Sequence, residues 1–200
     1  MKKNNNQINI PTPSQKEVKK YLKLWDSLEN YTSQEISLKK LFTKTYPLNN
    51  DLDDVLIKVC SLNDFYSTNI FSPFDVARHI VAMNIDEYIS RDDLKIVNRI
   101  AKVRMNGGKL RNFYSFATKY CSHHKPTIYP IYDSYVEKIL LYFKRKDDFF
   151  SFKKDDLKIY VSYKNTLIKF RQYYGLDSFN LKEIDQYLWQ VGKQYYPKKY

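Results

Sequence analysis

The sequence predicts an all-α fold, and three observations lead to this prediction. The chain of 200 residues has only 4 Gly and 7 Pro, which is sparse turn punctuation for an all-β protein. Its hydrophobic fraction of 43% is enough to form a core. Apolar residues recur at helical spacing along most of the chain, and no segment alternates convincingly like a strand. We therefore expect nine or so short helices in one globule, which could consist of two helical lobes.

The first helix is expected directly after a polar tail. Residues 1–13 are rich in Asn and end in Pro-Thr-Pro, so we predict a disordered N-terminal tail and a single all-α domain over residues 14–200. Ser14 and Glu17 have the spacing of a capping box, and Val18 and Tyr21 begin an apolar face. The Ser72-Pro73 pair predicts another helix start. Further helices are expected over 34–44, 51–62, 92–103, 111–123, 134–143, 155–174 and 181–195.

The charge of the chain favours a polyanionic partner. The formal net charge is +12, which attracts nucleic acids and speeds association with them. A Lys-rich and Asn-rich composition can also reflect an AT-rich genome, so the charge has an alternative explanation. The 19 Tyr and 12 Phe exceed what a core needs, and some of them could stack on a base.

Cysteine usage and hydropathy exclude several classes of protein. The two cysteines, Cys60 and Cys121, suggest no disulfide framework, and no metal-ligand spacing occurs. We expect no metal and no cofactor. The N-terminus has no apolar core typical of a secretory signal, and no apolar run approaches 18 residues. The expectation is a cytoplasmic monomer, associated with the nucleoid in a prokaryote and not with a membrane.

The segment Arg111–Leu140 carries the residues best suited to chemistry. An expected helix ends in Ser-His-His-Lys-Pro, and a loop then leads to Pro130-Ile-Tyr-Asp133 at the start of the next helix. Ser134 and Glu137 have capping-box spacing, which would leave Asp133 free to face a cleft. Alternatively, Asp133 is itself the N-cap, and the two roles can coexist.

Residues 96–140 resemble the helix-hairpin-helix plus Asp module of base-excision DNA glycosylases, and are most similar to the 8-oxoguanine DNA glycosylase branch, including its archaeal form. The matching features are the Gly107-Gly108 turn, the run Phe116-Ala-Thr-Lys119, a Lys-Pro break, and the Pro-Ile-Tyr-Asp motif ending at Asp133. The family motif is Pro-Val-Asp, so Tyr132 is an inserted residue here. The resemblance places a helix-hairpin-helix at about 92–124, and the first third of the chain has no match.

This resemblance implies an enzyme that binds double-stranded DNA, extrudes a damaged or modified base and cleaves its N-glycosidic bond. Asp133 would stabilise the developing sugar cation or activate the nucleophile. The family nucleophile is a Lys at the start of the helix after the hairpin, where this chain has Asn112 or Phe113. Lys109 and Lys119 are the remaining candidates for an AP-lyase nucleophile, and water is the alternative. We also expect Asp133 to face a basic cleft between two lobes.

The resemblance also suggests residues that contact DNA. Ser67-Thr-Asn69-Ile70 is similar to the run that fills the hole left by the extruded base, although Asn69 could be only a turn residue. Cations and backbone N–H groups around the turn could bind phosphates; these residues are Arg104, Gly107, Gly108, Lys109, Arg111 and Lys119.

The adjacent histidines His123 and His124 have three possible roles. They point about 100° apart on a helix, which disfavours a shared metal. A helix-end position or a contact with a phosphate or base is expected instead. Among the C-terminal aromatics, Tyr187, Trp189, Tyr195 and Tyr196, most should pack and one could stack on a base.

Two other classes of function remain open from the sequence. The first is a non-catalytic helix-hairpin-helix protein that binds nucleic acid, in which Asp133 would be only a helix cap. The second is a protein-interaction module whose charge is incidental.

Overall fold

The structure is a computed structural model, and it describes residues 8–197. Its predominantly helical architecture confirms the all-α prediction. The α-helices are α1 (Gln15–Asp26), α2 (Glu29–Lys40), α3 (Leu52–Tyr66), α4 (Pro73–Ala82), α5 (Ile85–Ser90), α6 (Lys95–Ala101), α7 (Tyr114–His124), α8 (Ser134–Asp147), α9 (Tyr160–Tyr173) and α10 (Leu181–Tyr195). A π-helical turn (Leu41–Thr45), a 3₁₀ turn (Lys154–Lys158) and the strands β1 (Lys102–Arg104) and β2 (Leu110–Asn112) complete the described elements.

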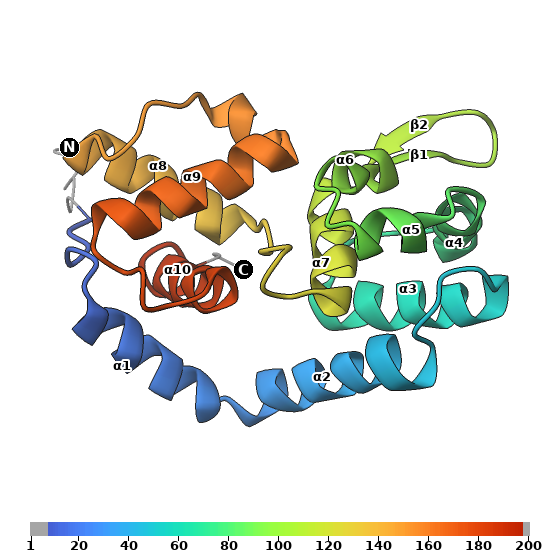
Figure 1. The fold of residues 1–200 in the computed structure, drawn as a ribbon, viewed down its shortest axis with the longest axis horizontal. Helices are drawn as coiled ribbons and strands as arrows, with labels where there is room; N and C mark the ends of the chain where they lie inside the picture. Colours follow the sequence, from blue (N-terminus) through green and yellow to red (C-terminus); the bar gives the residue numbers. More distant parts are fainter. Residues whose placement is uncertain (1–7, 198–200) are drawn as a thin grey trace, which may run out of the picture.

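The helices form two groups, which we call the central lobe and the terminal lobe (Figure 1). The central lobe holds α3 to α7 with the two strands. The terminal lobe holds α8 to α10, and α1 packs against α10 although the two helices lie near opposite ends of the sequence. Helix α2 runs from the terminal lobe to the central lobe, and the segment between α7 and α8 forms a second connection. The buried side chains of both lobes belong to one hydrophobic cluster.

Local capping explains where α1 and α10 begin. The backbone N–H of Glu17 donates to Ser14 Oγ at 3.3 Å, so Ser14 is the N-cap of α1, as predicted. Helix α10 begins after Asn180, which forms a capping box with Glu183, and its bounds match the expected range. Pro73 occupies the first turn of α4, also as predicted. Each of these starts depends on residues adjacent in sequence.

The prediction of a disordered tail over residues 1–13 is wrong for residues 8–13. Ile10 is buried, its N–H donates to Tyr142 Oη at 3.1 Å, and Lys146 Nζ donates to its carbonyl at 3.0 Å. Two backbone hydrogen bonds thus attach this polar segment to α8, and its one buried side chain joins the hydrophobic cluster. Residues 1–7 lie outside the described part of the chain.

The expected helix-hairpin-helix at about 92–124 is a helix, a β-hairpin and a helix. After α6 the chain forms β1 and β2, which pair antiparallel with Val103 opposite Arg111. Gly107 and Gly108 have φ values of 87° and 84°, which suit glycine at the hairpin tip. The Gly-Gly turn therefore joins two strands and not two helices. Strands of three residues are too short to show an alternating pattern, which is why the sequence did not indicate them.

Two other expected helices are shorter than predicted. The range 92–103 contains only the seven residues of α6 before β1 begins. The range 155–174 starts with the 3₁₀ turn, and α9 begins at Tyr160. The expected end of that helix is confirmed, since Gly175 has φ 63° just after α9.

Candidate functional site: a pocket between the lobes

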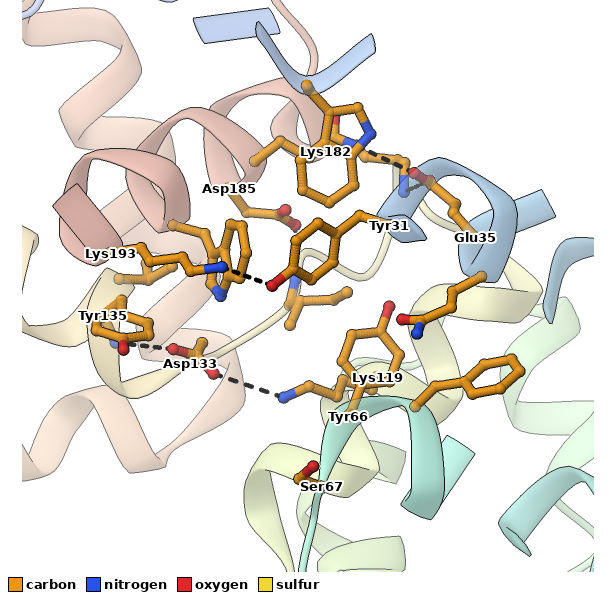
Figure 2. A pocket seen from close by; sticks show the side chains of 17 residues that line it. Tyr31, Glu35, Tyr66, Ser67, Lys119, Asp133, Tyr135, Lys182, Asp185 and Lys193 are labelled. Carbon is orange, nitrogen blue, oxygen red and sulfur yellow. Dashed lines mark hydrogen bonds and ion pairs between the residues drawn. The ribbon is translucent and has the colours of Figure 1, made fainter. Parts of the chain in front are cut away.

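A cavity of about 300 Å³ opens between the two lobes (Figure 2). The central lobe supplies side chains from α7 and from the end of α3, and the terminal lobe supplies side chains from α1, α8 and α10. Helix α2 contributes a third wall. The lining residues are Trp25, Tyr31, Gln34, Glu35, Phe65, Tyr66, Ser67, Lys119, Ile131, Asp133, Tyr135, Val136, Lys182, Asp185, Gln186, Trp189 and Lys193.

Lys119 and Asp133, two of the residues singled out in the sequence, meet in this pocket. Lys119 Nζ lies 3.9 Å from Asp133 Oδ2, and the lysine side chain is 4% exposed against 23% for the aspartate. Figure 2 shows the pair facing each other across the gap between α7 and the start of α8. The amine also donates to Ser115 Oγ at 2.6 Å. The pocket therefore holds a nearly buried amine beside a partly accessible carboxylate.

Asp133 combines the two roles that the sequence left open. It is the N-cap of α8, because its Oδ1 accepts from the backbone N–H of Tyr135 at 2.8 Å. Its second oxygen, Oδ2, faces Lys119. The expected Ser134/Glu137 capping pair is wrong, because Ser134 already lies inside α8. Glu137 is instead bound by the hydroxyl of Tyr132 and by two lysines of the 3₁₀ turn.

Burial shifts Lys119 towards its neutral form. Burial lowers the pKa of Lys119, and the nearby carboxylates of Asp133 and Asp185 only partly oppose this effect. The ring centroid of Tyr66, 5.2 Å from Nζ, opposes the effect of burial as well, because an aromatic face favours the charged amine. A lower pKa enlarges the fraction of unprotonated amine at any given pH. An unprotonated amine is the form that acts as a nucleophile.

Asp185 is a second carboxyl in the pocket, and the sequence analysis missed it. It lies on α10, and burial raises its pKa to about 7. Its Oδ2 accepts from the backbone N–H of Ile131 at 2.7 Å. A carboxyl with this pKa can gain or lose a proton near neutral pH. The signal that could have found it is its spacing from Leu181 and Leu188, which puts it on the buried face of α10.

Aromatic rings form one wall of the pocket. The ring centroid of Trp189 lies 5.8 Å from Trp25, 5.2 Å from Tyr31 and 6.4 Å from Tyr135. Lys193 Nζ donates to Tyr31 Oη at 2.5 Å and lies 5.0 Å from the Trp189 ring. Of the C-terminal aromatics considered for stacking, Trp189 lines the pocket. Tyr187 is buried in the core.

The charge of the lining is balanced, so the expectation of a basic cleft is wrong for the pocket itself. Three lysines and three carboxylates line it: Lys119, Lys182, Lys193, Glu35, Asp133 and Asp185. Lys182 and Glu35 form an ion pair that joins α10 to α2, and Gln186 Nε2 donates to Glu35 Oε2 at 3.3 Å. The excess positive charge of the protein must therefore lie outside the pocket.

The β-hairpin carries part of that positive charge. Lys102, Arg104, Lys109 and Arg111 are all exposed there, and Gly107 and Gly108 form the exposed tip. Arg104 donates to the carbonyl of Gly108 at 3.0 Å, and the N–H of Asn106 donates to Asp75 on α4 at 2.9 Å. Lys109 does not line the pocket. Of the two lysines proposed as nucleophile, the structure places Lys119 next to Asp133.

The structure corrects the expectation that His123 and His124 contact DNA. Both lie in the last turn of α7, but their rings pack inward against Phe42. His123 Nε2 is 3.1 Å from Tyr66 Oη, and the His124 ring is 3.2 Å from the side-chain amide of Asn49. Burial lowers the pKa of each histidine to about 3. Two neutral, internal rings are poor ligands for a phosphate.

Asn69 lies in an exposed turn whose first residue, Ser67, reaches the pocket. Ser67 and Asn69 have left-handed φ values of 48° and 58°, and the side chain of Asn63 binds both backbone groups of Ile70 at 3.0 and 3.1 Å. The turn thus has a defined conformation, and it holds Phe71 with 96% of its surface exposed. The sequence analysis did not single out Phe71, because the neighbouring residues do not indicate which of the many aromatic side chains will be exposed.

Within residues 8–197, no group of three or more His, Cys, Asp or Glu side chains is placed to hold a metal ion. In the same part of the chain, no helix combines the length and apolar character needed to cross a bilayer.

The fold and pocket define an all-α protein with a lysine–carboxylate pair between two lobes. The chain belongs to the HI_0787_N family, whose model is described as an N-terminal domain and matches residues 17–128. A Haemophilus influenzae protein named only "Uncharacterized protein" is 46% identical over 165 residues, which is 82% of this chain and 79% of the relative. No solved structure matches the chain. The family match includes Lys119 and ends before Asp133 and α10.

Proposed function

We propose that this protein is a DNA glycosylase with AP-lyase activity, which extrudes a damaged or modified base from double-stranded DNA and removes it. The observation that carries the proposal is the Lys119–Asp133 pair in the pocket between two helical lobes. The resemblance to the helix-hairpin-helix glycosylases points to Asp133 and leaves Lys109, Lys119 and water as candidate nucleophiles, and the geometry favours Lys119 among them. Sequence resemblance and side-chain geometry therefore support one interpretation.

The shape of the pocket suits a nucleobase. A flipped base is commonly read by stacking on aromatic side chains and by hydrogen bonds to its edge. Tyr31 and Trp189 offer aromatic faces, and Gln34, Gln186 and Asp185 offer polar groups. With a pKa raised to about 7, Asp185 could donate or accept a hydrogen bond to such an edge.

The chemistry proposed for the pair begins with the neutral amine of Lys119. Its lone pair attacks C1′ of the extruded nucleotide, and the bond from C1′ to the base breaks. The base leaves with the bonding electrons and takes up a proton, while Asp133 stabilises the positive charge on the sugar. The nitrogen then passes a proton to O4′ as the C1′–O4′ bond breaks, so the sugar ring opens and the nitrogen lone pair forms a Schiff base with C1′. Loss of a C2′ proton expels the 3′ phosphate and cuts the strand.

Binding to the duplex would use the β-hairpin and the turn that follows α3. The cations of the β-hairpin can neutralise phosphates. By its resemblance to the family run, Asn69 would fill the gap left by the extruded base, and its turn reaches the pocket at Ser67. The exposed ring of Phe71 on the same turn is a candidate to wedge between bases.

The test is incubation with duplexes that carry a panel of lesions, followed by borohydride reduction and gel separation. We expect a trapped protein–DNA complex with at least one lesion. The complex should disappear in Lys119→Gln and persist in the matched control Lys109→Gln. Base release without a trapped complex would assign the nucleophile to water. Binding without any base release would leave the non-catalytic nucleic-acid binder, and the glycosylase proposal would be wrong.

A further inference from the structure

Ser115 lies one helical turn before Lys119 on α7, and its hydroxyl makes two hydrogen bonds. Its Oγ donates to the carbonyl of Tyr132 at 3.1 Å, and it accepts from Lys119 Nζ at 2.6 Å. A carbonyl oxygen can only accept, so the hydroxyl hydrogen is committed to Tyr132. The amine must therefore be the donor in the second bond. A neutral Lys119 held in this way directs its lone pair away from Ser115.

The neighbouring Thr118 also contacts Tyr132 but not the amine. The backbone N–H of Tyr132 donates to Thr118 Oγ1 at 3.1 Å. Both backbone groups of Tyr132 are thus bound by hydroxyls of α7. Tyr132 is the extra residue relative to the Pro-Val-Asp motif, and it directly precedes Asp133. These bonds account for how a chain with the insertion still brings Asp133 to Lys119.

We propose that Ser115 is a positioning residue, which holds the Lys119 amine at the pocket floor facing Asp133. This proposal builds on the function proposed above. The other titratable and aromatic groups near the amine are Asp133 on α8, Asp185 on α10, Tyr66 on α3 and His123 on α7 itself. Within residues 8–197, the bond to Ser115 is the one hydrogen bond that the amine makes.

A fixed amine matters because the lysine side chain is long and flexible. A nucleophile must lie within about 3 to 3.5 Å of the reacting carbon, and a misplacement of about 1 Å can slow a reaction roughly 100-fold. The bonds from Ser115 to Lys119 and to Tyr132 connect the amine to the segment that carries Asp133. One hydroxyl therefore sets the position of both groups.

The test compares Ser115→Ala with Ser115→Thr and with the control Thr118→Val, which removes a hydroxyl bound to the same Tyr132. The first measurement is the acetylation of Lys119 in the free protein as a function of pH, quantified by peptide mass spectrometry with Lys109 as the internal reference. Ser115 accepts a hydrogen bond that favours the charged amine, so Ser115→Ala should move the midpoint to lower pH. Ser115→Thr should restore it, and Thr118→Val should leave it near the wild-type value.

The second measurement is the rate of borohydride trapping on a lesion duplex. We expect Ser115→Ala to slow trapping by about 10-fold or more, with recovery in Ser115→Thr. An unchanged midpoint in Ser115→Ala, or an equal shift in Thr118→Val, would overturn the proposal. If the wild type releases no base from any lesion, the glycosylase function fails; base release without trapping removes only the nucleophile role of Lys119. The acetylation series still decides whether Ser115 holds the amine.

Discussion

Replacing Asp133 by Asn removes the negative charge of the pocket carboxylate and keeps a side chain that can cap α8. Asn is as good an N-cap as Asp, and its side-chain oxygen can accept from Tyr135 as Asp133 Oδ1 does now. We therefore expect the capping contribution to the free energy of unfolding to change by less than about 1 kcal/mol. The negative charge 3.9 Å from Lys119 Nζ would be lost.

The size of the effect on Lys119 follows from that distance. Two opposite charges about 4 Å apart attract by about 1 kcal/mol in water and by about 4 kcal/mol at the effective dielectric constant of a protein surface. The lysine is 4% exposed and the aspartate 23%, so the pair lies between these limits. Loss of the carboxylate destabilises the ammonium form. The pKa of Lys119, already lowered by burial, should therefore fall further.

The reactivity of the Lys119 amine and the rate of base release should then change in opposite directions. The midpoint for acetylation of Lys119 should shift to lower pH, so the amine becomes more reactive at neutral pH. Base release from a lesion duplex should nevertheless fall by about 100-fold or more, because Asp133 no longer assists the reaction. The control is Asp92→Asn, which removes a carboxylate from the more exposed Lys125–Asp92 pair and should change neither value. An unmoved midpoint in Asp133→Asn would refute the electrostatic argument.

Three further predictions concern binding, acid stability and packing. Arg104→Ala combined with Lys109→Ala should weaken binding to all DNA sequences alike and lower the log–log salt slope by about two, measured by titration at several salt concentrations. His123 and His124 have pKa values of about 3 in the folded protein against an ordinary value of 6.5, so the unfolded chain binds more protons and stability falls as the pH drops below 6.5. Each histidine raises the unfolding constant by up to about tenfold for each pH unit of acidification. Asp185, with a pKa of about 7, gains a proton in the folded protein and so cancels the effect of one histidine down to about pH 4. Urea melts that show no loss of stability between pH 7 and pH 5 would contradict this prediction. Gly192→Ala should destabilise the fold by about 1 to 3 kcal/mol, because its Cβ would lie 2.5 Å from the nearest atom of α8, and thermal melts would measure the loss.

Several elements could be derived from the sequence because neighbouring residues encode them. Ser14 begins α1 through a hydrogen bond to a residue three positions away. The apolar spacing after Asn180 sets the expected range of α10, which the structure matches. The same local signals failed at the hairpin. Strands of three residues leave too short a pattern, and the Gly-Gly turn alone does not say whether strands or helices flank it.

The candidate residues Lys119 and Asp133 were also identified from the sequence, through resemblance and through the helix start after Pro130. What the sequence left open was which lysine lies beside Asp133. That choice depends on the path of residues 125–133, which bonds from Ser115 and Thr118 to Tyr132 hold in place. Lys109 is nearer the turn that resembles the family motif, yet the hairpin carries it away from the pocket.

The remaining walls of the pocket were decided by tertiary structure alone. Asp185 and Trp189 on α10 meet Tyr31 on α2 and Lys119 on α7 only after the two ends of the chain pack together. No spacing within one helix encodes those contacts, because the residues are far apart in sequence and lie on different elements. Local patterns thus determined most of the helices, and the resemblance pointed to Asp133 and two candidate lysines. Packing between the lobes determined which side chains surround them and gave Lys119 its lowered pKa through burial.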